Sequence, residues 1–432
     1  MVEEKRSVMK YIRTYETEEK FLADKDSTSR GFRLKPTLYK YSEAGDHVQL
    51  ELDDPRKHGD STYMEITLDS DVEFSFYIGN APDDTQTTMN CSIDWGDGTV
   101  ETKTITEEIM TDDYNDNKGF KLSHSYKAGS YKIELYGVER DYSIAGGNEG
   151  SSMGVPYYDS HISHPSAITR VILGSNVVSM GNGAFTWCTS LISIHISEGV
   201  TSIGVGVFDE CSSLKLVYIP NSVTSIGDLA FRQCTSLTSI NIPESVTSIG
   251  EQAFFYCISL TSVYIPSGVT SIAFNTFYSC SSLKSFYIPE GVVSIGGCAF
   301  RGCSSLTSIH IPEGVTSIGY RAFDGCTSLT SINIPEGVTS IGYNAFDCCS
   351  SLTSISFPES VTSIGNRAIS GCRLLSSISS YRLTAPTTSE KSLYIGFVGR
   401  GTIHIKPGAT GYDAWLSQLS SPGYDWTIVE DL

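Results

Sequence analysis

The sequence predicts a mainly β protein in which a β-sandwich is followed by a solenoid of 23-residue repeats. Three observations support this prediction. Cysteine recurs every 23 residues from Cys188 to Cys372. Between residues 60 and 140, short alternating apolar segments are separated by turns and show no helical period. The 432 residues also exceed one ordinary domain of roughly 100–200 residues, so the chain has room for several units.

The repeat is defined by columns of like residues that all advance by the same step. The unit is C-x-S-L-T-S-I-x-I-P-E-G-V-T-S-I-G-x-x-A-F-x-x, with a degenerate first copy near Ile168. Its period lies within the roughly 20–29 residues of leucine-rich repeats, and L-T-S-I-N-I has their L-x-x-L-x-L strand pattern. The sequence therefore predicts a leucine-rich repeat solenoid. Further columns run over Leu191 to Leu375, Phe185 to Phe346 (Ile369 takes the ninth place) and Pro220 to Pro358.

Each unit predicts a principal strand and a second short extended segment. Ile240 and Ile242 alternate with polar neighbours, as expected for a strand with one buried face. The segment V-T-S-I-G at 246–250 follows, and its glycine permits a turn. One unit cannot bury its apolar side alone, so stacking at about 4.8 Å is expected to join about ten units into one core.

The repeat unit resembles the BspA-like leucine-rich repeat family, which is common in surface proteins of gut and oral bacteria. The resemblance covers residues 168–380. It implies a non-enzymatic scaffold for recognition or adhesion, with a protein or glycan partner and a location at the cell surface or outside the cell.

The preceding segment contains two motifs, C-S-I-D-W-G-D-G-T-V at 91–100 and H-S-Y-K-A-G-S-Y-K-I-E-L-Y-G at 124–137. They resemble a PKD-type domain, which is an immunoglobulin-like β-sandwich. Gly96 and Gly98 would allow the positive φ of a tight turn between two strands. We therefore expect a PKD-like sandwich over residues 60–140.

The remaining segments complete the predicted organisation. Residues 1–59 are expected to be an N-terminal docking or leader segment, 141–166 a Gly/Ser-rich linker, 167–380 the solenoid and 381–432 its C-terminal cap. The segments at 11–23 and 401–430 also resemble structural proteins of gut Bacteroidales phages. A virion structural or receptor-binding protein is therefore the alternative function, and a virion the alternative location.

Charge and hydropathy exclude some classes of partner. A formal net charge of −19 disfavours nucleic acid, which binds through cationic surfaces. No apolar run approaches the roughly 18 residues of a membrane-spanning helix, so membrane insertion is not expected. The first residues lack the apolar core of a secretory signal peptide. The oligomeric state is left open by the sequence.

One column at the outward position of the principal strand is the predicted ligand-binding site. Exposed tyrosines provide contact area at low entropic cost, which suits protein or glycan recognition. A solvated strand face whose tyrosine rings only pack on one another would show the same sequence pattern. The column contains His195, Tyr218, Asn241, Tyr264, Tyr287, His310 and Asn333.

A glutamate column follows each strand, at Glu198, Glu244, Glu290, Glu313, Glu336 and Glu359. Like charges about 4.8 Å apart repel one another, so this column predicts either a compensating basic partner or cation, or a solvated edge that discourages aggregation.

The cysteine column has two interpretations. Neighbours about 4.8 Å apart lie within the range that disulfides allow, roughly 4.4–6.8 Å between Cα atoms. Neighbouring side chains in one column point in parallel, which disfavours a bond between them, and nine members cannot all form pairs. Both arguments favour buried thiols instead. Cys298 and Cys348 lie outside the column and are expected to fill variable positions.

Cofactors, metals and catalytic residues are not predicted. Asp94 and Asp97, with Asp112, Asp113 and Asp116, could hold calcium, but aspartates at such a turn usually serve the turn itself. Phosphate-binding loops, zinc-protease motifs and C-x-x-C pairs are absent from the sequence. The sequence therefore predicts that the protein is not an enzyme.

Overall fold

The computed structural model describes residues 38–41, 47–50, 61–80, 88–106, 108–111, 116–136, 138, 142–144, 149–152, 155–158, 162–388, 400–419 and 425–432. The chain divides into two compact units, Met1–Asp53 and Asp54–Leu432. In the first unit, strands β1 (Leu38–Tyr41) and β2 (His47–Leu50) form an antiparallel pair. The rest of the predicted docking segment at 1–59 lies outside the described residues.

The second unit begins with two antiparallel sheets around a buried core. One sheet has the order β3-β9-β5-β6, and the other has the order β10-β4-β8-β7. In β4, Phe74, Phe76 and Ile78 are at most 2% exposed, as expected when alternate residues face a core. The sandwich expected before the repeats is therefore present, and its assignment to the PKD type stays a prediction. Its strands are β3 (Thr62–Leu68), β4 (Val72–Asn80), β5 (Thr88–Asp94), β6 (Val100–Thr106), β7 (Glu108–Thr111), β8 (Asp116–Tyr126), β9 (Gly129–Tyr136) and β10 (Tyr142–Ile144).

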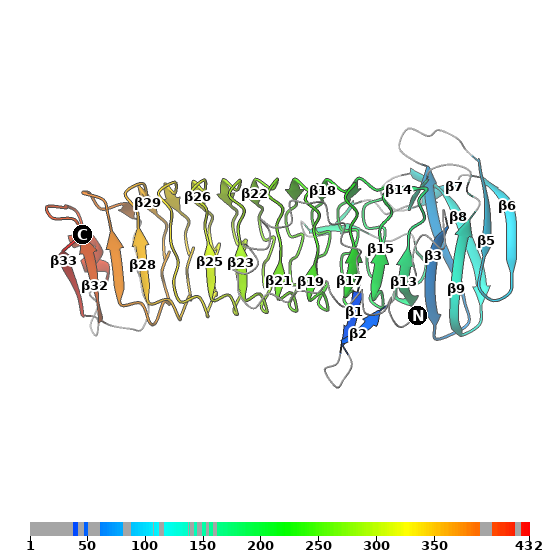
Figure 1. Cartoon of the computed structure of the whole chain (residues 1–432), viewed down its shortest axis with the longest axis horizontal. Helices are drawn as coiled ribbons and strands as arrows, with labels where there is room; N and C mark the ends of the chain where they lie inside the picture. The colour runs from blue at the N-terminus through cyan, green and yellow to red at the C-terminus, as the bar shows by residue number, and fades with distance from the viewer. Residues whose placement is uncertain are drawn as a thin grey trace, which may run out of the picture. The chain divides into compact units, whose positions relative to one another are not determined.

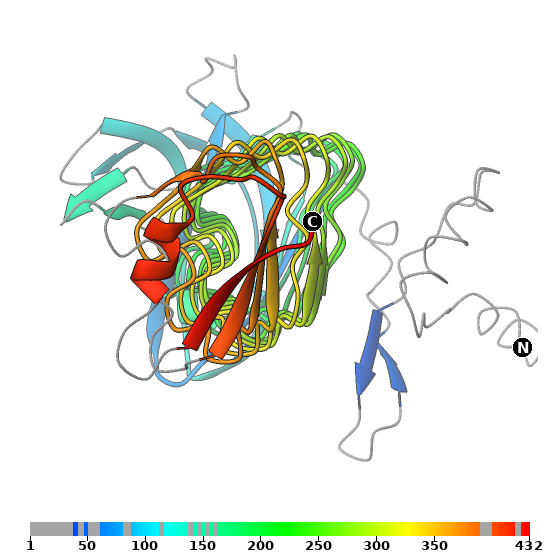
Figure 2. The ribbon, with the colours of Figure 1, turned by 90° about the vertical axis from the view of Figure 1, so that its left-hand side faces the viewer.

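The solenoid follows, and its turns superimpose when it is seen end-on (Figure 2). The principal strands pair in parallel on one side, and the short T-S-I strands pair in parallel on a second side (Figure 1). The principal strands are β13 (Ile168–Ile172), β15 (Ser193–His195), β17 (Leu216–Tyr218), β19 (Ser239–Ile240), β21 (Ser262–Val263), β23 (Ser285–Tyr287), β25 (Ser308–His310), β28 (Ser354–Phe357) and β30 (Ser377–Ser380). The second side has β14 (Val177–Met180), β16 (Ser202–Ile203), β18 (Ser225–Ile226), β20 (Ser248–Ile249), β22 (Ser271–Ile272), β24 (Ser294–Ile295), β26 (Ser317–Ile318), β27 (Ser340–Ile341), β29 (Ser363–Ile364) and β31 (Thr387–Thr388).

A third side is built from the turn G-x-x-A-F-x-x, which we call the outer turn. Its backbone N–H groups donate to the next repeat, for example from Phe208 to the Ala230 oxygen at 2.9 Å. Inside the solenoid, the phenylalanine rings stack in one line, with centroids 5.4 Å apart for Phe231 and Phe254. These columns have the 23-residue step of the sequence, so the predicted solenoid and the mainly β fold class are confirmed.

The sandwich and the solenoid share both of their sheets. Strand β13 pairs antiparallel with β3 and parallel with β15, so one sheet runs from the sandwich into the repeats. Strand β10, inside the segment predicted as a linker, pairs with β4 of the sandwich and β14 of the solenoid. The same segment contributes β11 (Glu149–Ser152) and β12 (Val155–Tyr158), and η3 (Pro165–Ala167) follows them. The sandwich therefore covers the N-terminal end of the repeat core.

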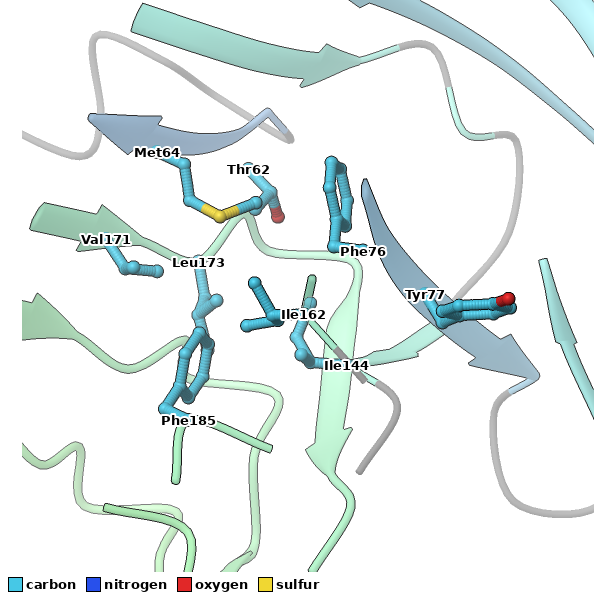
Figure 3. Close-up of a pocket in the computed structure, with 9 residues that line it drawn as sticks. All are labelled: Thr62, Met64, Phe76, Tyr77, Ile144, Ile162, Val171, Leu173 and Phe185. Carbon is cyan, nitrogen blue, oxygen red and sulfur yellow. The ribbon is translucent and has the colours of Figure 1, made fainter. Parts of the chain in front are cut away.

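A cavity of about 10 Å³ lies at this junction, between Met64 and Phe76 of the sandwich and Phe185 of the first full repeat (Figure 3). Its lining is almost entirely apolar. A space of this size holds about one water molecule, and apolar cavities stay dry. This cavity is a packing gap and too small for a ligand.

The other end of the solenoid is closed by the segment predicted as a cap. Strands β32 (Arg400–Ile405) and β33 (Asp425–Glu430) extend the principal sheet beyond β30, all in parallel. Helix α3 (Asp413–Leu419) places Trp415 against Phe357, and both side chains are at most 1% exposed. Apolar side chains of the last repeat are thereby removed from water.

Close backbone contact between turns explains the glycine of V-T-S-I-G. A Cβ atom built on Gly342 would lie 2.5 Å from the Tyr320 nitrogen, whereas one built on Gly314 would lie no closer than 3.4 Å to any atom. We expect Gly342→Ala to lower the free energy of unfolding by roughly 1–3 kcal/mol, because two turns must move apart. Gly314→Ala is the matched control, and urea unfolding of both variants measures the effect. Equal midpoints for the two variants would contradict this account of the glycine column.

Candidate binding face of the repeat sheet

The seven predicted site residues occupy one position of successive turns. His195, Tyr218, Tyr287 and His310 end their strands, and Asn241, Tyr264 and Asn333 follow the corresponding isoleucine or valine in their own repeats. All seven are half-buried or exposed, while the residues on either side in the chain are mostly buried. The column therefore lies on the solvent side of the principal sheet.

Neighbouring rings in this column stack face to face. His195 pairs in register with Tyr218, and their ring centroids lie 4.3 Å apart at an interplanar angle of 2°. Tyr287 and His310 are paired likewise, at 6.1 Å and 12°. Within each pair one face of each ring is turned toward its partner, so the aromatic side chains of the column support one another.

The tyrosine hydroxyls donate hydrogen bonds to the glutamate column. Tyr218 donates to Glu198 Oε1 at 2.8 Å, and Tyr264 donates to Glu244 Oε1 at 2.7 Å. In both pairs the tyrosine reaches back to the glutamate of the preceding repeat. Tyr287 instead donates to Glu290 of its own repeat at 3.3 Å.

The two columns predicted separately are thus linked into one surface by hydrogen bonds at Glu198, Glu244 and Glu290. His310 Nε2 adds a contact to Glu290 at 3.5 Å. We call this surface the Tyr–Glu strip, and it comprises His195, Glu198, Tyr218, Asn241, Glu244, Tyr264, Tyr287, Glu290, His310 and Asn333.

The hydroxyls of Tyr218 and Tyr264 remain protonated over the physiological range. Partial burial, together with the neighbouring carboxylate, raises the pKa of Tyr218 and of Tyr264 to about 12. Each hydroxyl therefore acts as a donor that partly offsets the charge of one glutamate. The repulsion expected along the glutamate column is reduced within the strip itself.

The cysteine column is a ladder of buried thiols. Each Sγ from Cys211 to Cys372 donates to the carbonyl oxygen of a phenylalanine 26 residues earlier, at 3.1 or 3.2 Å. Burial raises the pKa of Cys257 and Cys303 to about 12. The nine cysteines of the column are free thiols, so the thiol interpretation of the column agrees with the structure and the disulfide interpretation does not.

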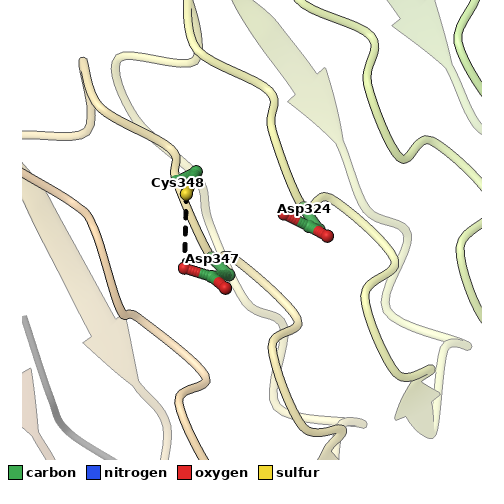
Figure 4. A group of neighbouring side chains, drawn as sticks. All are labelled: Asp324, Asp347 and Cys348. Atoms are coloured by element: carbon green, nitrogen blue, oxygen red, sulfur yellow. Dashed lines mark hydrogen bonds between the residues drawn. The ribbon is translucent and has the colours of Figure 1, made fainter.

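A cluster of possible metal ligands lies on the outer turns, where Asp324, Asp347 and Cys348 approach one another (Figure 4). Cys348 Sγ donates to Asp347 Oδ1 at 3.5 Å, and Arg301 binds the Asp324 carboxylate at 2.8 Å. Because Arg301 pairs with Asp324, Asp347 and Cys348 are the two potential ligands of this cluster that are left for a metal. Two ligands are fewer than the four of a structural zinc site. The cluster is better explained by these contacts than by a metal.

In the sandwich, the aspartates of the W-G-D-G turn serve the turn. Asp94 Oδ1 accepts the Gly96 N–H at 2.8 Å, and Asp97 Oδ1 accepts the Thr99 N–H at 2.9 Å. Asp97 Oδ2 also lies 2.8 Å from His124 Nε2. Asp112 and Asp113, and the side chain of Asp116, lie outside the described residues, so the calcium interpretation gains no support from the structure.

The fold and these columns define a parallel β-solenoid repeat protein. A family model described as a BspA type leucine rich repeat region matches residues 162–284 and 270–385, together more than half of the chain. The chain belongs to this family of leucine-rich repeat proteins. Comparison with curated proteins gives no match.

Similar solved structures come from several bacteria. A leucine rich cell surface protein of Faecalibacterium prausnitzii is 28% identical, with 56% of this chain and 91% of that chain covered and a TM-score of 0.34. A leucine-rich repeat protein of Bacteroides ovatus is 22% identical, covering 81% and 100%, with a TM-score of 0.41. The pneumococcal vaccine antigen PcpA is 18% identical, covering 69% and 86%, also with a TM-score of 0.41.

The PKD type of the sandwich and the resemblance of both chain ends to phage proteins have no counterpart in these matches, and they stay predictions. Within the described parts of the chain, none of the helices has the length and apolar character needed to cross a membrane.

Thiol labelling tests the burial of the cysteine ladder. Cys348 is exposed, whereas the other eleven cysteines are buried. At about pH 8, near the usual thiol pKa, we expect one thiol per native chain to react with a disulfide reagent and all twelve to react after unfolding. Cys348→Ser should abolish the rapid reaction. Rapid reaction of several thiols in that variant would contradict the buried ladder.

The Asp97–His124 contact predicts an acid-dependent contribution to the stability of the sandwich. The hydrogen bond from His124 lowers the pKa of Asp97 to about 2. Because the folded-state pKa is depressed, the contribution is present above about pH 4 and is lost as the pH falls toward about 2. Asp97→Asn should make the urea midpoint less dependent on pH over this interval, and exposed Asp69→Asn is the control. Parallel pH profiles for wild type and Asp97→Asn would exclude this role.

Proposed function

We propose that the protein is a non-enzymatic recognition or adhesion protein that binds a protein or glycan partner through the Tyr–Glu strip. The observation that carries the proposal is the hydrogen bonding of Tyr218 and Tyr264 to glutamates of the preceding repeat. These bonds hold the aromatic side chains in place before any partner arrives. Less side-chain entropy is then lost on binding.

The chemistry of the strip suits either class of partner. Carboxylate oxygens can accept hydrogen bonds from sugar hydroxyls as well as from protein N–H groups. Ring edges and hydroxyls add amphipathic contact area. Membership of the BspA type family supports a location at the cell surface or outside the cell, where such partners occur.

The test is binding of the full chain to a panel of gut glycans and extracellular-matrix proteins. We expect at least one selective ligand, and we expect the Tyr218→Ala/Tyr264→Ala/Tyr287→Ala variant to bind it roughly tenfold more weakly or worse, because the variant removes rigid contact area and three hydroxyl donors. Tyr381→Ala is the control, since Tyr381 is exposed beyond the last repeat strand. Circular dichroism verifies the fold of each variant.

The triple variant also defines the contrary outcome. A folded triple variant that binds the ligand with unchanged affinity would exclude the Tyr–Glu strip as the binding surface.

A further inference from the structure

The outer turns carry a second set of aromatic side chains, away from the principal sheet. We call it the outer-turn aromatic cluster, and it spans repeats between residues 251 and 346. Tyr256, Tyr320 and Tyr343 are 43%, 36% and 48% exposed, unusually high for large rings. The cluster comprises Phe255, Tyr256, Phe274, Tyr278, Tyr320 and Tyr343.

The rings of this cluster contact one another across repeats. Tyr278 stacks on Phe255 with centroids 4.7 Å apart, and Tyr343 stacks on Tyr320 at 5.0 Å. Phe274 contacts Tyr320 at 6.0 Å, although the two residues are separated by a whole repeat. Phe274 and Tyr278 belong to the same turn, so the two stacks are neighbours on one side of the solenoid.

Gly297 makes the contact between Phe274 and Tyr320 possible. It occupies the same repeat position as Phe274 and Tyr320, in the turn between them. A Cβ atom at Gly297 would lie 2.5 Å from Tyr320 Cε1. The absence of a side chain therefore lets the Tyr320 ring lean across this turn and join the cluster.

Charged residues surround the aromatic centre, and the carboxylates outnumber the arginines: Asp209, Glu210, Asp228, Glu251, Asp324 and Asp347 against Arg232, Arg301 and Arg321. Arg232 is held by both carboxylate oxygens of Asp209, and Arg301 is held by Asp324 while it lies over the Tyr278 ring at 5.2 Å. The exposed carboxylate of Asp228 lies on the turn before the cluster, and that of Glu251 lies on the first turn of the cluster. Arg321, next to Tyr320 in the chain, lies 3.9 Å from Asp324. An apolar aromatic centre with an arginine and a charged rim is the usual anatomy of a protein interface.

We propose that the outer-turn aromatic cluster is a second binding site, whose partner is a protein segment with an apolar or aromatic centre flanked by lysine or arginine. The acidic rim supplies the charge complementarity. A second copy of this chain fits poorly, because each copy has a net charge of −19. A sugar ring stacks on an open aromatic face, and in each stack of this cluster one face of each ring is covered by its partner. The proposal is independent of the Tyr–Glu strip.

A peptide library displayed on phage tests the proposal with the full chain as target. We expect enriched peptides to combine basic residues with an aromatic or aliphatic centre. Their affinity should fall roughly tenfold or more in Tyr320→Ser/Tyr343→Ser, since both rings are lost from the centre of the surface. The matched control is Tyr381→Ser/Leu383→Ser, which removes two exposed side chains outside both surfaces and should bind like the wild type.

Gly297→Ala is the sharper variant, because it keeps every aromatic side chain and only displaces Tyr320. It should weaken the same peptides by a smaller factor. Several outcomes would overturn the proposal: no enrichment, enriched peptides without basic residues, or peptides whose binding the Tyr320→Ser/Tyr343→Ser variant leaves unchanged. Oligosaccharide binding on a glycan array that this variant abolishes would assign the surface to glycans instead.

Discussion

The constraint on which the structure depends is the backbone hydrogen bonding of each turn to the next at a fixed step of 23 residues. Parallel pairing aligns Ser225 with Ser248 on one side of the solenoid, and the outer turns bond in the same register on another. Once this step is fixed, every residue type that recurs becomes a line of touching side chains. Glycine is needed where backbones approach most closely, as at Gly342. The aligned phenylalanine rings and thiols then fill the core with one repeated packing solution.

The same constraint places like residues beside like residues, which is favourable for apolar rings and unfavourable for charges. In the structure, charged side chains are paired with a hydrogen-bond donor or an opposite charge from a neighbouring column or a neighbouring repeat. Tyr218 supplies a donor to Glu198, and Arg232 binds Asp209 in the adjacent repeat. Side chains that depart from the repeat pattern therefore determine local chemistry, whereas the constant residues determine the fold.

The period explains why most of the fold could be predicted from the sequence. Columns such as Leu191 to Leu375 define both the buried face and the stacking register, and both are found. The pairing of β13 with β3 could not be predicted, because an antiparallel contact between segments about 100 residues apart leaves no periodic signal. The bond from Tyr264 to Glu244 was also missed, although tyrosine follows glutamate by 20 residues at both Tyr218 and Tyr264. The outer-turn aromatic cluster was missed because its members are divided among three repeat positions, and because Phe274 and Tyr320 meet only across Gly297, which has no side chain.

The ends of the solenoid show why a repeat array requires unlike segments. A last parallel strand with unpaired N–H and C=O groups would offer an edge for aggregation, and its apolar side would meet water. At the N-terminal end of the solenoid, β3 pairs with the first principal strand. At the C-terminal end, β32 and β33 extend the sheet, and the side chain of Trp426 is buried. Both ends of the apolar core are thereby covered. The exposed side chains of the Tyr–Glu strip and of the outer-turn aromatic cluster are not needed to shield the core from water. Because the Tyr–Glu strip and the outer-turn cluster share no side chains, substitutions in one should leave the other unchanged, as expected for sites without common contacts.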